Sequence, residues 1–166
     1  MTLARKSPRD LQKFSYLGKG NSMKLWYKVK NPLRIVWNFI IMSLCKIIPS
    51  LSLKNALYRS LGIKIGKNVS IGLNAMLDIF FPELIEIGDN TIVGQNVTII
   101  AHEFLIDDWR IGKVKIGKNV MIGINSTIIA GVTIGDNSII SACSFVNKEV
   151  KPFTFVEGVP IRTVNR

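Results

Sequence analysis

A six-residue repeat of apolar and small side chains runs through the second half of the chain. Aliphatic residues recur at every sixth position, at Ile116, Ile122, Ile128, Ile134, Ile140 and Val146. Four residues after each comes a small or branched side chain, at Val120, Ser126, Val132, Ser138, Ser144 and Val150. Because the period is even, both positions point to the same side of an extended chain. This pattern predicts a parallel β-solenoid from residue 65 to about residue 150.

The same repeat begins earlier, and Gly and Asn mark its corners. The aliphatic series starts at Ile65, Ile71 and Leu77 and continues at Ile87, Val93 and Ile99. Gly often follows the aliphatic position, and Asn or Asp recurs two or three places later. Gly and Asn tolerate backbone angles that other residues avoid, so we expect the chain to turn at these places.

The spacing of the repeat breaks twice, after Leu77 and after Ile99. We therefore expect a small excursion at 80–83 and an inserted loop at about 101–115. Insertions in solenoids often carry the function. His102, the only histidine in the chain, lies at the root of the longer insertion.

An apolar helix is expected ahead of the repeat, from Leu33 to Ile48. Asn31, Arg34, Asn38 and Lys46 form one thin polar stripe along it. A helix that is apolar over most of its circumference must be buried in something. Its 16 residues fall short of the ~20 that a transmembrane helix needs.

A second helix is expected from Ser52 to Leu61, with Ser50 or Ser52 as its N-cap and Gly62 after its end. Leu53, Leu57 and Leu61 share one face of this helix. Because a repeat protein needs a cap on its terminal turn, we expect these leucines to plug the open end of the solenoid.

The positive charge of the chain is confined to its first third. The 166 residues carry a formal net charge of +11, and residues 1–60 hold twelve Lys and Arg against one acid, Asp10. Residues 61–166 hold ten bases and ten acids. Bases beside an apolar helix favour an interfacial helix on an anionic membrane surface. Packing of the helix on the solenoid or on a neighbouring subunit is the alternative, and we expect no nucleic acid partner.

We expect three regions: a basic, apolar helical leader at 1–62, the solenoid at 63–151, and a C-terminal tail at 152–166. The two cysteines, Cys45 and Cys143, make no disulfide framework and suit no metal site. With no signal peptide expected, we place the protein in the cytoplasm, peripheral on the inner face of the cell membrane.

Three segments resemble the hexapeptide-repeat acyltransferases, in particular their galactoside, maltose and xenobiotic O-acetyltransferase branch. They are the block IGKNVMIGINSTIIAGVTIGDNSIISACSFVNKEV at 116–150, the close KPFTFVEGVPIRTV, and NVTIIAHEF before the inserted loop. The resemblance begins at about residue 61. It implies an all-β solenoid, a left-handed parallel β-helix with three hexads per coil. The chain then has about four coils, at 65–82, 87–102, 116–133 and 134–151.

The resemblance also implies the chemistry. Members of the family transfer an acyl group from acetyl-CoA or another acyl-CoA, use no metal, and form homotrimers with CoA in a groove between neighbouring prisms. His102 matches the catalytic base, which takes the proton of a hydroxyl or amine acceptor. Glu103, Asp107 or Asp108 could orient its ring. The matching cofactor-binding positions, each of which also has a purely structural reading, are Gly123, Ile124, Ala142, Asn147, Lys148 and Arg162.

The expected acceptor is a sugar. Asp78, Glu103 and Trp109 are the candidate substrate-binding residues: Asp78 lies near where relatives bind a sugar hydroxyl, and Trp109 could stack on a sugar face. The soluble sugar acetyltransferases carry a different N-terminal segment, so the basic, apolar leader points instead to a lipid-linked or membrane-resident glycan. Asp78 and Trp109 could equally anchor loops.

Two other functions fit the same fold. A γ-class carbonic anhydrase holds zinc with three histidines, which this chain, with one, cannot supply from a single subunit. A non-catalytic, membrane-associated scaffold would have no need of a catalytic His102. Acyl transfer is therefore the function that we expect.

Overall fold

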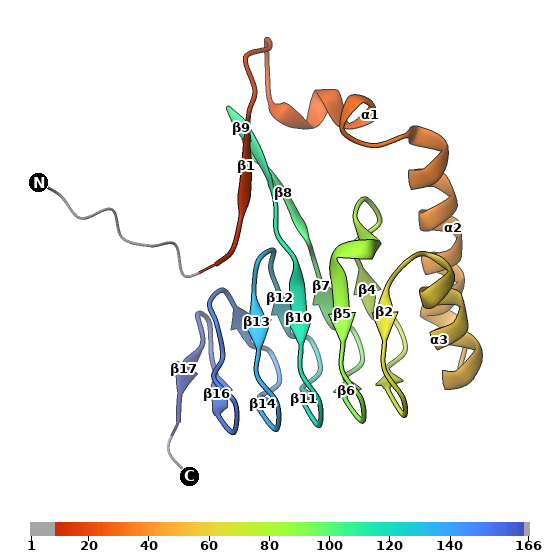
Figure 1. Ribbon diagram of the computed structural model, residues 1–166, viewed down its shortest axis with the longest axis vertical. Coiled ribbons are helices and arrows are strands. Elements are labelled where there is room, and N and C mark those ends of the chain that lie inside the picture. Colours follow the sequence, from red (N-terminus) through yellow and green to blue (C-terminus); the bar gives the residue numbers. More distant parts are fainter. Residues whose placement is uncertain (1–8, 165–166) are drawn as a thin grey trace, which may run out of the picture.

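The computed structural model describes residues 9–164, and its centre is a solenoid of three parallel sheets (Figure 1). Sheet 1 contains β2 (Lys64–Ile65), β5 (Ile85–Ile87), β10 (Val114–Ile116) and β13 (Thr133–Ile134). Sheet 2 contains β3 (Ser70–Ile71), β6 (Ile92–Val93), β11 (Met121–Ile122), β14 (Ile139–Ile140), β16 (Phe155–Glu157) and β17 (Arg162–Thr163). Sheet 3 contains β4 (Met76–Leu77), β7 (Thr98–Ile99), β12 (Thr127–Ile128) and β15 (Phe145–Val146). Four successive turns of the chain each give one strand to every sheet.

Equivalent positions of the repeat stack directly on one another in these sheets. In sheet 1, Ile65 pairs with Ile87, and Ile116 pairs with both Ile87 and Ile134. The aliphatic positions and the small or branched positions four residues later are both buried, as at Ile122 and Ser126. The even period therefore directs both sets of side chains into the core, as the sequence predicts.

Asparagines form the corners of the solenoid. Seven of them adopt a left-handed backbone with φ between 54° and 59°: Asn68, Asn74, Asn90, Asn96, Asn119, Asn125 and Asn137. Their amides form two ladders along the solenoid, from Asn74 through Asn96 to Asn125 and from Asn90 through Asn119 to Asn137. Asn suits these corners because its short side chain tolerates the left-handed region and bonds to the next turn.

The inserted loop is a β-hairpin that extends away from the solenoid. Its strands are β8 (His102–Phe104) and β9 (Asp108–Ile111), and β1 (Gln12–Ser15) adds a third antiparallel strand beside β9 (Figure 1). The leader is therefore not wholly helical. Four residues with no clear alternation gave no signal for β1, whose partner strand lies far along the chain.

The C-terminal segment expected as a tail continues sheet 2. β16 pairs in parallel with β14, and β17 folds back antiparallel on β16. Val156 and Ile161 are buried at this end. The apolar positions of the closing segment thus extend the core by part of another turn.

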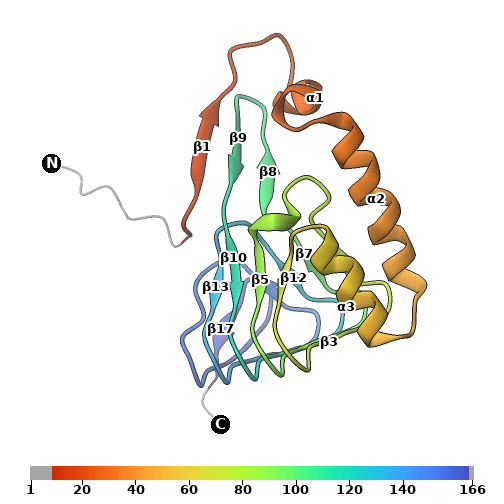
Figure 2. The same cartoon turned by 45° about the vertical axis from the view of Figure 1, so that its right-hand side comes forward.

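Helices α2 (Pro32–Ile47) and α3 (Leu51–Ser60) cover the N-terminal end of the solenoid (Figures 1 and 2). The short η1 (Ser22–Leu25) and α1 (Trp26–Val29) lie near the tip of the hairpin, and η2 (Pro82–Leu84) interrupts the repeat. Side chains cap both long helices: the Asn31 side chain accepts from the Leu33 N–H, and the Ser50 hydroxyl accepts from the Leu53 N–H. Within residues 9–164, no helix is long and apolar enough to cross a membrane.

The expected leucine plug forms only in part, because the face of α3 that covers the solenoid is largely polar. Leu61 is buried and Leu57 packs against the core, but Leu53 is 52% exposed. Lys54, Asn55 and Tyr58 are buried in its place. The Lys54 ammonium donates to the Ile71 carbonyl at 2.9 Å, and the Asn55 amide donates to the Val69 carbonyl at 2.8 Å. The Arg59 guanidinium donates to the Ile65 and Gly66 carbonyls.

The direction of the backbone hydrogen bonds explains this polar face. N–H groups of the first turn donate to carbonyls of the second, as from Gly66 to Ile87 and from Gly72 to Val93. The first-turn carbonyls at the equivalent positions, Ile65, Val69 and Ile71, have no earlier turn to donate to them, whereas those at the corners, such as Lys67, accept from the second turn. A buried carbonyl without a hydrogen-bond donor lowers the stability of the fold. The helix that covers the first turn must therefore present donors, and not leucines, to these carbonyls.

This arrangement predicts that two substitutions in α3 differ in their effect on the free energy of unfolding. Asn55→Ala should lower the free energy of unfolding by about 1–3 kcal/mol, because the buried Val69 carbonyl loses its donor. Leu53→Ala should change it by less than about 0.5 kcal/mol, because Leu53 lies on the outer face. Urea unfolding followed by circular dichroism measures both values, and the reverse order would support the leucine plug.

Candidate active site

The site is built around His102 and Asp78, which follow neighbouring strands of sheet 3. Asp78 comes directly after β4, and His102 lies three residues beyond the end of β7. Because Leu77 pairs with Ile99 in parallel register, both residues leave the sheet at the same corner. The Nδ1 atom of His102 lies 2.5 Å from Oδ2 of Asp78.

Backbone groups hold the Asp78 carboxylate in place. Its Oδ1 accepts from the Phe80 and Phe81 N–H groups at 2.7 and 2.9 Å, and its Oδ2 also accepts from the Ala101 N–H at 2.7 Å. Burial raises the pKa of Asp78, but the hydrogen bond and charge of His102 and the backbone donors outweigh it and lower the pKa. The carboxylate therefore stays ionised although its side chain is fully buried.

An ionised Asp78 fixes the protonation pattern of His102. An imidazole whose Nδ1–H donates to a carboxylate keeps its lone pair on Nε2. The histidine side chain is 16% exposed. The arrangement therefore holds the neutral form of the imidazole in one tautomer and one orientation, with Nε2 as the nitrogen that can accept a proton from a bound acceptor.

The structure places the other acidic candidates differently from the sequence-based expectation. Asp78, expected to contact the acceptor, instead turns inward and orients His102. Glu103 forms an ion pair with Arg9. Asp108 pairs with Lys13 at 2.7 Å and with Arg110 at 3.2 Å. The side chain of Asp107 is exposed on the hairpin, so Asp78 alone among these four acids bonds to the His102 ring.

Three aromatic rings lie around His102, and no pattern in the sequence predicted them. The ring centroids of Phe80, Phe104 and Phe81 lie 4.7, 5.2 and 6.0 Å from that of His102. Trp109, the expected sugar platform, stacks on Phe14 of β1 with 4.2 Å between centroids. One face of the indole is thus already covered, and Trp109 anchors β1 to the hairpin.

Three of the expected cofactor positions gather at a different corner of the solenoid. Gly123 and Ile124 lie between β11 and β12, and Ala142 lies one turn further on. A Cβ atom on Gly123 would come within 2.4 Å of the Ala142 nitrogen, so close stacking of the turns requires glycine. Ile124 and Ala142 are exposed.

The remaining cofactor candidates lie in the last turns. Asn147 and Lys148 follow β15, and Arg162 starts β17. The Oδ1 atom of Asn147 is buried and has no hydrogen-bond partner among residues 9–164. Lys148 and Arg162 are exposed. Asn147 and Lys148 thus lie at the corner between sheets 3 and 1, on the side of His102 and not beside Gly123 and Ala142.

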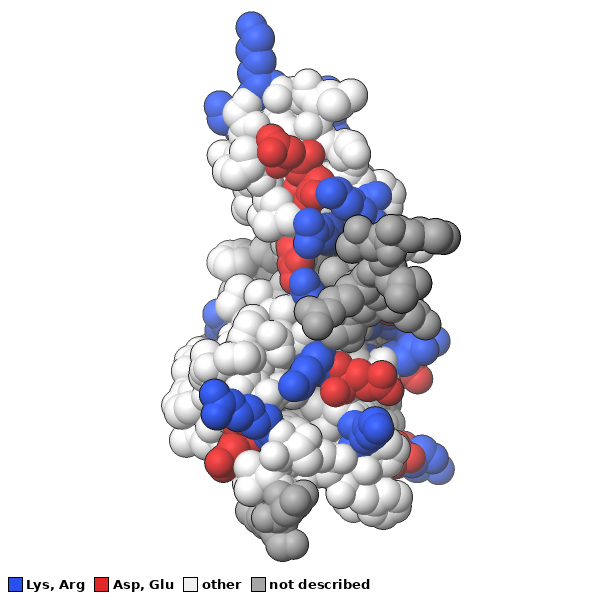
Figure 3. Space-filling view, turned by 90° about the vertical axis from the view of Figure 1, so that its left-hand side faces the viewer, with Lys and Arg blue, Asp and Glu red and all other residues white. Residues whose placement is uncertain are grey.

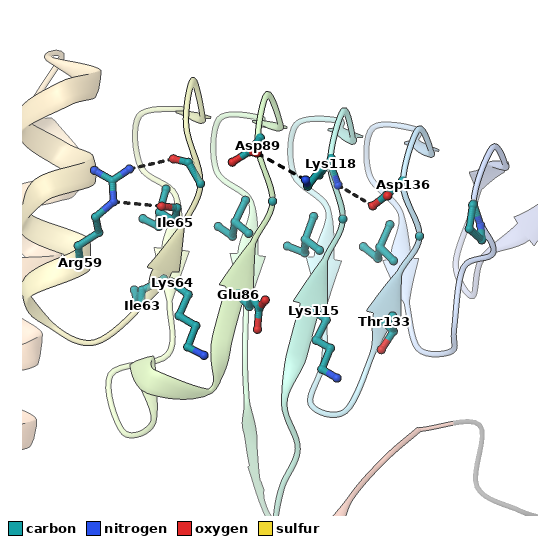
Figure 4. A pocket seen from close by; sticks show the side chains of 18 residues that line it. Arg59, Ile63, Lys64, Ile65, Glu86, Asp89, Lys115, Lys118, Thr133 and Asp136 are labelled. Atoms are coloured by element: carbon teal, nitrogen blue, oxygen red, sulfur yellow. Dashed lines mark hydrogen bonds and ion pairs between the residues drawn. The ribbon is translucent and has the colours of Figure 1, made fainter.

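A shallow hollow of about 750 Å³ lies over sheet 1, away from His102 (Figure 4). Lys64, Glu86, Lys115 and Thr133 form a row along its floor, one from each turn (Figure 4). Arg59 of α3 closes one end of the hollow. The hollow is open and follows a flat sheet, which suits contact with another protein surface better than a small ligand.

One chain does not bring the two groups of candidate residues together. His102 lies at the corner between sheets 3 and 1, whereas Gly123, Ile124 and Ala142 lie at the corner between sheets 2 and 3. The full width of sheet 3 separates them. Among the described residues no cluster of His, Cys, Asp and Glu suits a metal ion.

Comparison with known proteins shows the family to which the chain belongs. The model of the bacterial transferase hexapeptide (six repeats) matches residues 113–148, and that of the hexapeptide repeat of succinyl-transferase matches residues 62–101. The chain is 48% identical over 145 residues to "Putative acetyltransferase YvoF" of Bacillus subtilis (strain 168), which covers 87% of this chain and 84% of the relative. It is 38% identical over 110 residues to the galactoside O-acetyltransferase of Escherichia coli (strain K12), covering 60% and 54%.

A solved structure shares the architecture. The hexapeptide-repeat acetyltransferase VCA0836 of Vibrio cholerae, complexed with acetyl coenzyme A, superimposes with a TM-score of 0.64 at 22% identity, covering 80% of this chain and 86% of that one. The predicted left-handed parallel β-helix with preceding helices is thereby confirmed. With a relative 48% identical over most of its length, the chain belongs to the hexapeptide-repeat acetyltransferases.

Proposed function

We propose that this protein transfers an acetyl group from acetyl-CoA to a hydroxyl or amino group of a sugar, with His102 as the general base. The His102–Asp78 pair carries the proposal, because a buried, ionised carboxylate that fixes a histidine tautomer is the arrangement that base catalysis needs. The family relatives named as acetyltransferases support acetyl-CoA as the donor.

The proposed reaction follows from the chemistry of the two groups. The Nε2 atom of His102 takes the proton of the acceptor as its oxygen or nitrogen attacks the thioester carbonyl. The tetrahedral intermediate collapses and expels the CoA thiolate, which takes the proton back from His102. The Gly123 N–H already donates to the Ile140 carbonyl at 2.8 Å, so we assign the next N–H of that turn, at Ile124, to the oxyanion.

A second copy of the chain would complete the site, in keeping with a homotrimer. A threefold axis parallel to the solenoids keeps equivalent turns at one height, and His102 lies only one turn before Gly123. If sheet 1 of one copy faces sheet 2 of the next, the His102 corner of the first meets the Gly123 corner of the second. The hollow over sheet 1 would then receive the outward apolar side chains of sheet 2, such as Ile92 and Met121.

For the acceptor we propose a sugar carried by a lipid or held at the inner face of the cell membrane. The aromatic rings of Phe80 and Phe104 beside His102 offer apolar surface next to the base. The helices before the first turn expose apolar side chains among many bases. Both features suit an acceptor with an apolar part better than a fully polar free sugar.

Removing the imidazole separates catalysis from binding. His102→Ala should lower the rate of CoA release with an accepted sugar by about 10²–10⁴-fold, since the base is lost. Acetyl-CoA should raise the thermal midpoint of the variant as much as that of the wild type. Thiol titration with a panel of free and lipid-linked sugars measures the first effect. Unchanged biological function in the variant, with no acetyl-CoA stabilisation in either protein, would favour a non-catalytic scaffold.

Replacing the carboxylate tests its ionisation. The pKa of Asp78 in the folded protein lies below its ordinary value of 3.8. The stability that it contributes is therefore present above that value and is lost as the pH falls through the folded-state pKa. The wild type should melt above Asp78→Asn at pH 7, and the gap should shrink progressively below about pH 5. Thermal melts from pH 7 to pH 3 measure the gap, and a gap that does not depend on pH would refute an ionised Asp78.

Mixed assemblies test whether two copies share a site. His102→Ala and Ala142→Tyr should each be inactive, the second because its ring blocks the exposed corner at Ala142. When both are co-expressed with different tags and purified in tandem, every mixed trimer should hold one intact site. Activity should then recover to about one third of the wild type, as a cyclic assembly of three subunits requires. A mixture as inactive as its parents, with trimeric mass confirmed by light scattering, would place the whole site within one chain.

A further inference from the structure

Helix α2 buries one face, made by Ile35, Asn38, Ile41, Met42 and Cys45, and exposes a second apolar face. Asn38 is fully buried and donates to the Ile79 carbonyl at 2.8 Å, and Arg34 donates to the Leu61 carbonyl. The opposite face is apolar and 45% to 80% exposed. Its side chains are Leu33, Val36, Trp37, Phe39, Ile40, Leu44 and Ile47.

Exposed apolar side chains of α3 extend this surface. Leu51 and Leu53 are 43% and 52% exposed, because the polar residues of α3 cover the solenoid. Scattered apolar side chains are normal on a protein surface, but a continuous patch of this kind marks a site of contact with another apolar phase. We name the outer faces of α2 and α3 the end surface.

The end surface faces away from the coils of the solenoid. In both ribbon views α2 and α3 lie against the N-terminal end of the solenoid, opposite the last strands β16 and β17 (Figures 1 and 2). In the trimer proposed above, three parallel solenoids would carry three such surfaces at the same end. Together they would form one apolar platform perpendicular to the threefold axis.

The charge of the residues around the end surface indicates what kind of partner would bind to it. Residues 11–77 contain eleven Lys and Arg and no Asp or Glu. Within the described part of the chain, Lys13 and Lys30 form ion pairs with later acids and Lys54 is buried between α3 and the solenoid, which leaves eight of these bases without such a role. On the opposite side of the molecule, acidic and basic side chains are interspersed (Figure 3). A second trimer packed end to end would bring bases against bases, whereas an anionic bilayer supplies the opposite charge.

We propose that the end surface docks on an anionic lipid bilayer, with α2 lying in the headgroup region and the threefold axis perpendicular to the membrane. The 16 residues of α2 are too few to span a bilayer. An apolar face with aromatic side chains such as Trp37 and Phe39 is typical of helices that lie in the interface. Basic residues near the surface add attraction to anionic headgroups.

This orientation deepens the proposed function, on which its trimeric form rests. Asp78 ends the first turn and His102 follows the second, so the catalytic pair lies in the half of the solenoid nearer the end surface. A groove between two upright prisms would open toward the bilayer at that end. An acceptor anchored in the membrane could therefore reach His102 without leaving it.

Sedimentation with vesicles tests the surface and its direction. The full chain should sediment with vesicles that contain phosphatidylglycerol and bind weakly to vesicles of phosphatidylcholine alone. The double variant Val36→Glu and Ile40→Glu should reduce the bound fraction about tenfold or more, because it places two carboxylates on the apolar face. Phe153→Glu is the matched control: Phe153 is 81% exposed at the opposite end of the solenoid, and this variant should bind like the wild type.

Tryptophan quenching reports which face enters the lipid. Brominated phospholipids should quench the fluorescence of the wild type, and Trp37→Phe should remove most of the quenching, since Trp109 stacks on Phe14 and Trp26 lies outside α2. Three results would overturn the proposal. These are a wild type that ignores anionic vesicles, a double variant that binds them as well as the wild type, and a wild-type assembly whose mass falls in the double variant, which would show a second copy on α2.

Acetyl-CoA binding separates this inference from the proposed function. The thermal stabilisation by acetyl-CoA should be the same in the wild type, the double variant and Phe153→Glu, because none of these positions touches the catalytic corner. A wild type that binds vesicles but gains no stability from acetyl-CoA would contradict the acetyltransferase proposal and leave the membrane surface standing.

Discussion

The direction of the backbone hydrogen bonds between turns governs the arrangement of the whole molecule. At the strand ends, N–H groups of each turn donate to carbonyls of the turn that follows, as Gly66 does to Ile87 and Gly88 does to Ile116, while at the Asn corners the direction is reversed, as from Asn90 to Lys67. The first-turn carbonyls of Ile65, Val69 and Ile71 therefore have no earlier turn to donate to them and must find donors elsewhere. Lys54, Asn55 and Arg59 supply those donors. With these residues on the inner face of α3, Leu51 and Leu53 lie on its outer face.

The same stacking builds the corner that holds His102 and Asp78. Leu77 and Ile99 occupy equivalent repeat positions and pair in sheet 3, so the residues that follow them leave the sheet side by side. One turn supplies Asp78, and the next supplies His102 together with the hairpin. The backbone of the excursion after β4 then donates twice to the Asp78 carboxylate, which holds the pair in a fixed geometry without any contribution from a flexible side chain.

The repeat and its two interruptions were predictable because the period of six fixes which side chains face the core. The role of Asp78 was also within reach, since the register that pairs Leu77 with Ile99 places it beside His102. The orientation of α3 was not predictable. Three leucines at helical spacing suggest an apolar contact, and the need of the first-turn carbonyls for hydrogen-bond donors leaves no pattern in the sequence of the helix. Strand β1 and the stacking of Phe14 on Trp109 depend on contacts between distant segments.

In the proposed site, His102 is oriented by Asp78 and acts on a thioester bound at the Gly123 corner of a neighbouring copy. A crystal structure of the protein with acetyl-CoA and an acceptor should show Nε2 of His102 within hydrogen-bond reach of the attacking group. The thioester carbon should lie about 3–3.5 Å from that group, with the pantetheine along Ala142 of the partner. A thioester bound far from every His102, or one held wholly by the chain that supplies the histidine, would contradict it.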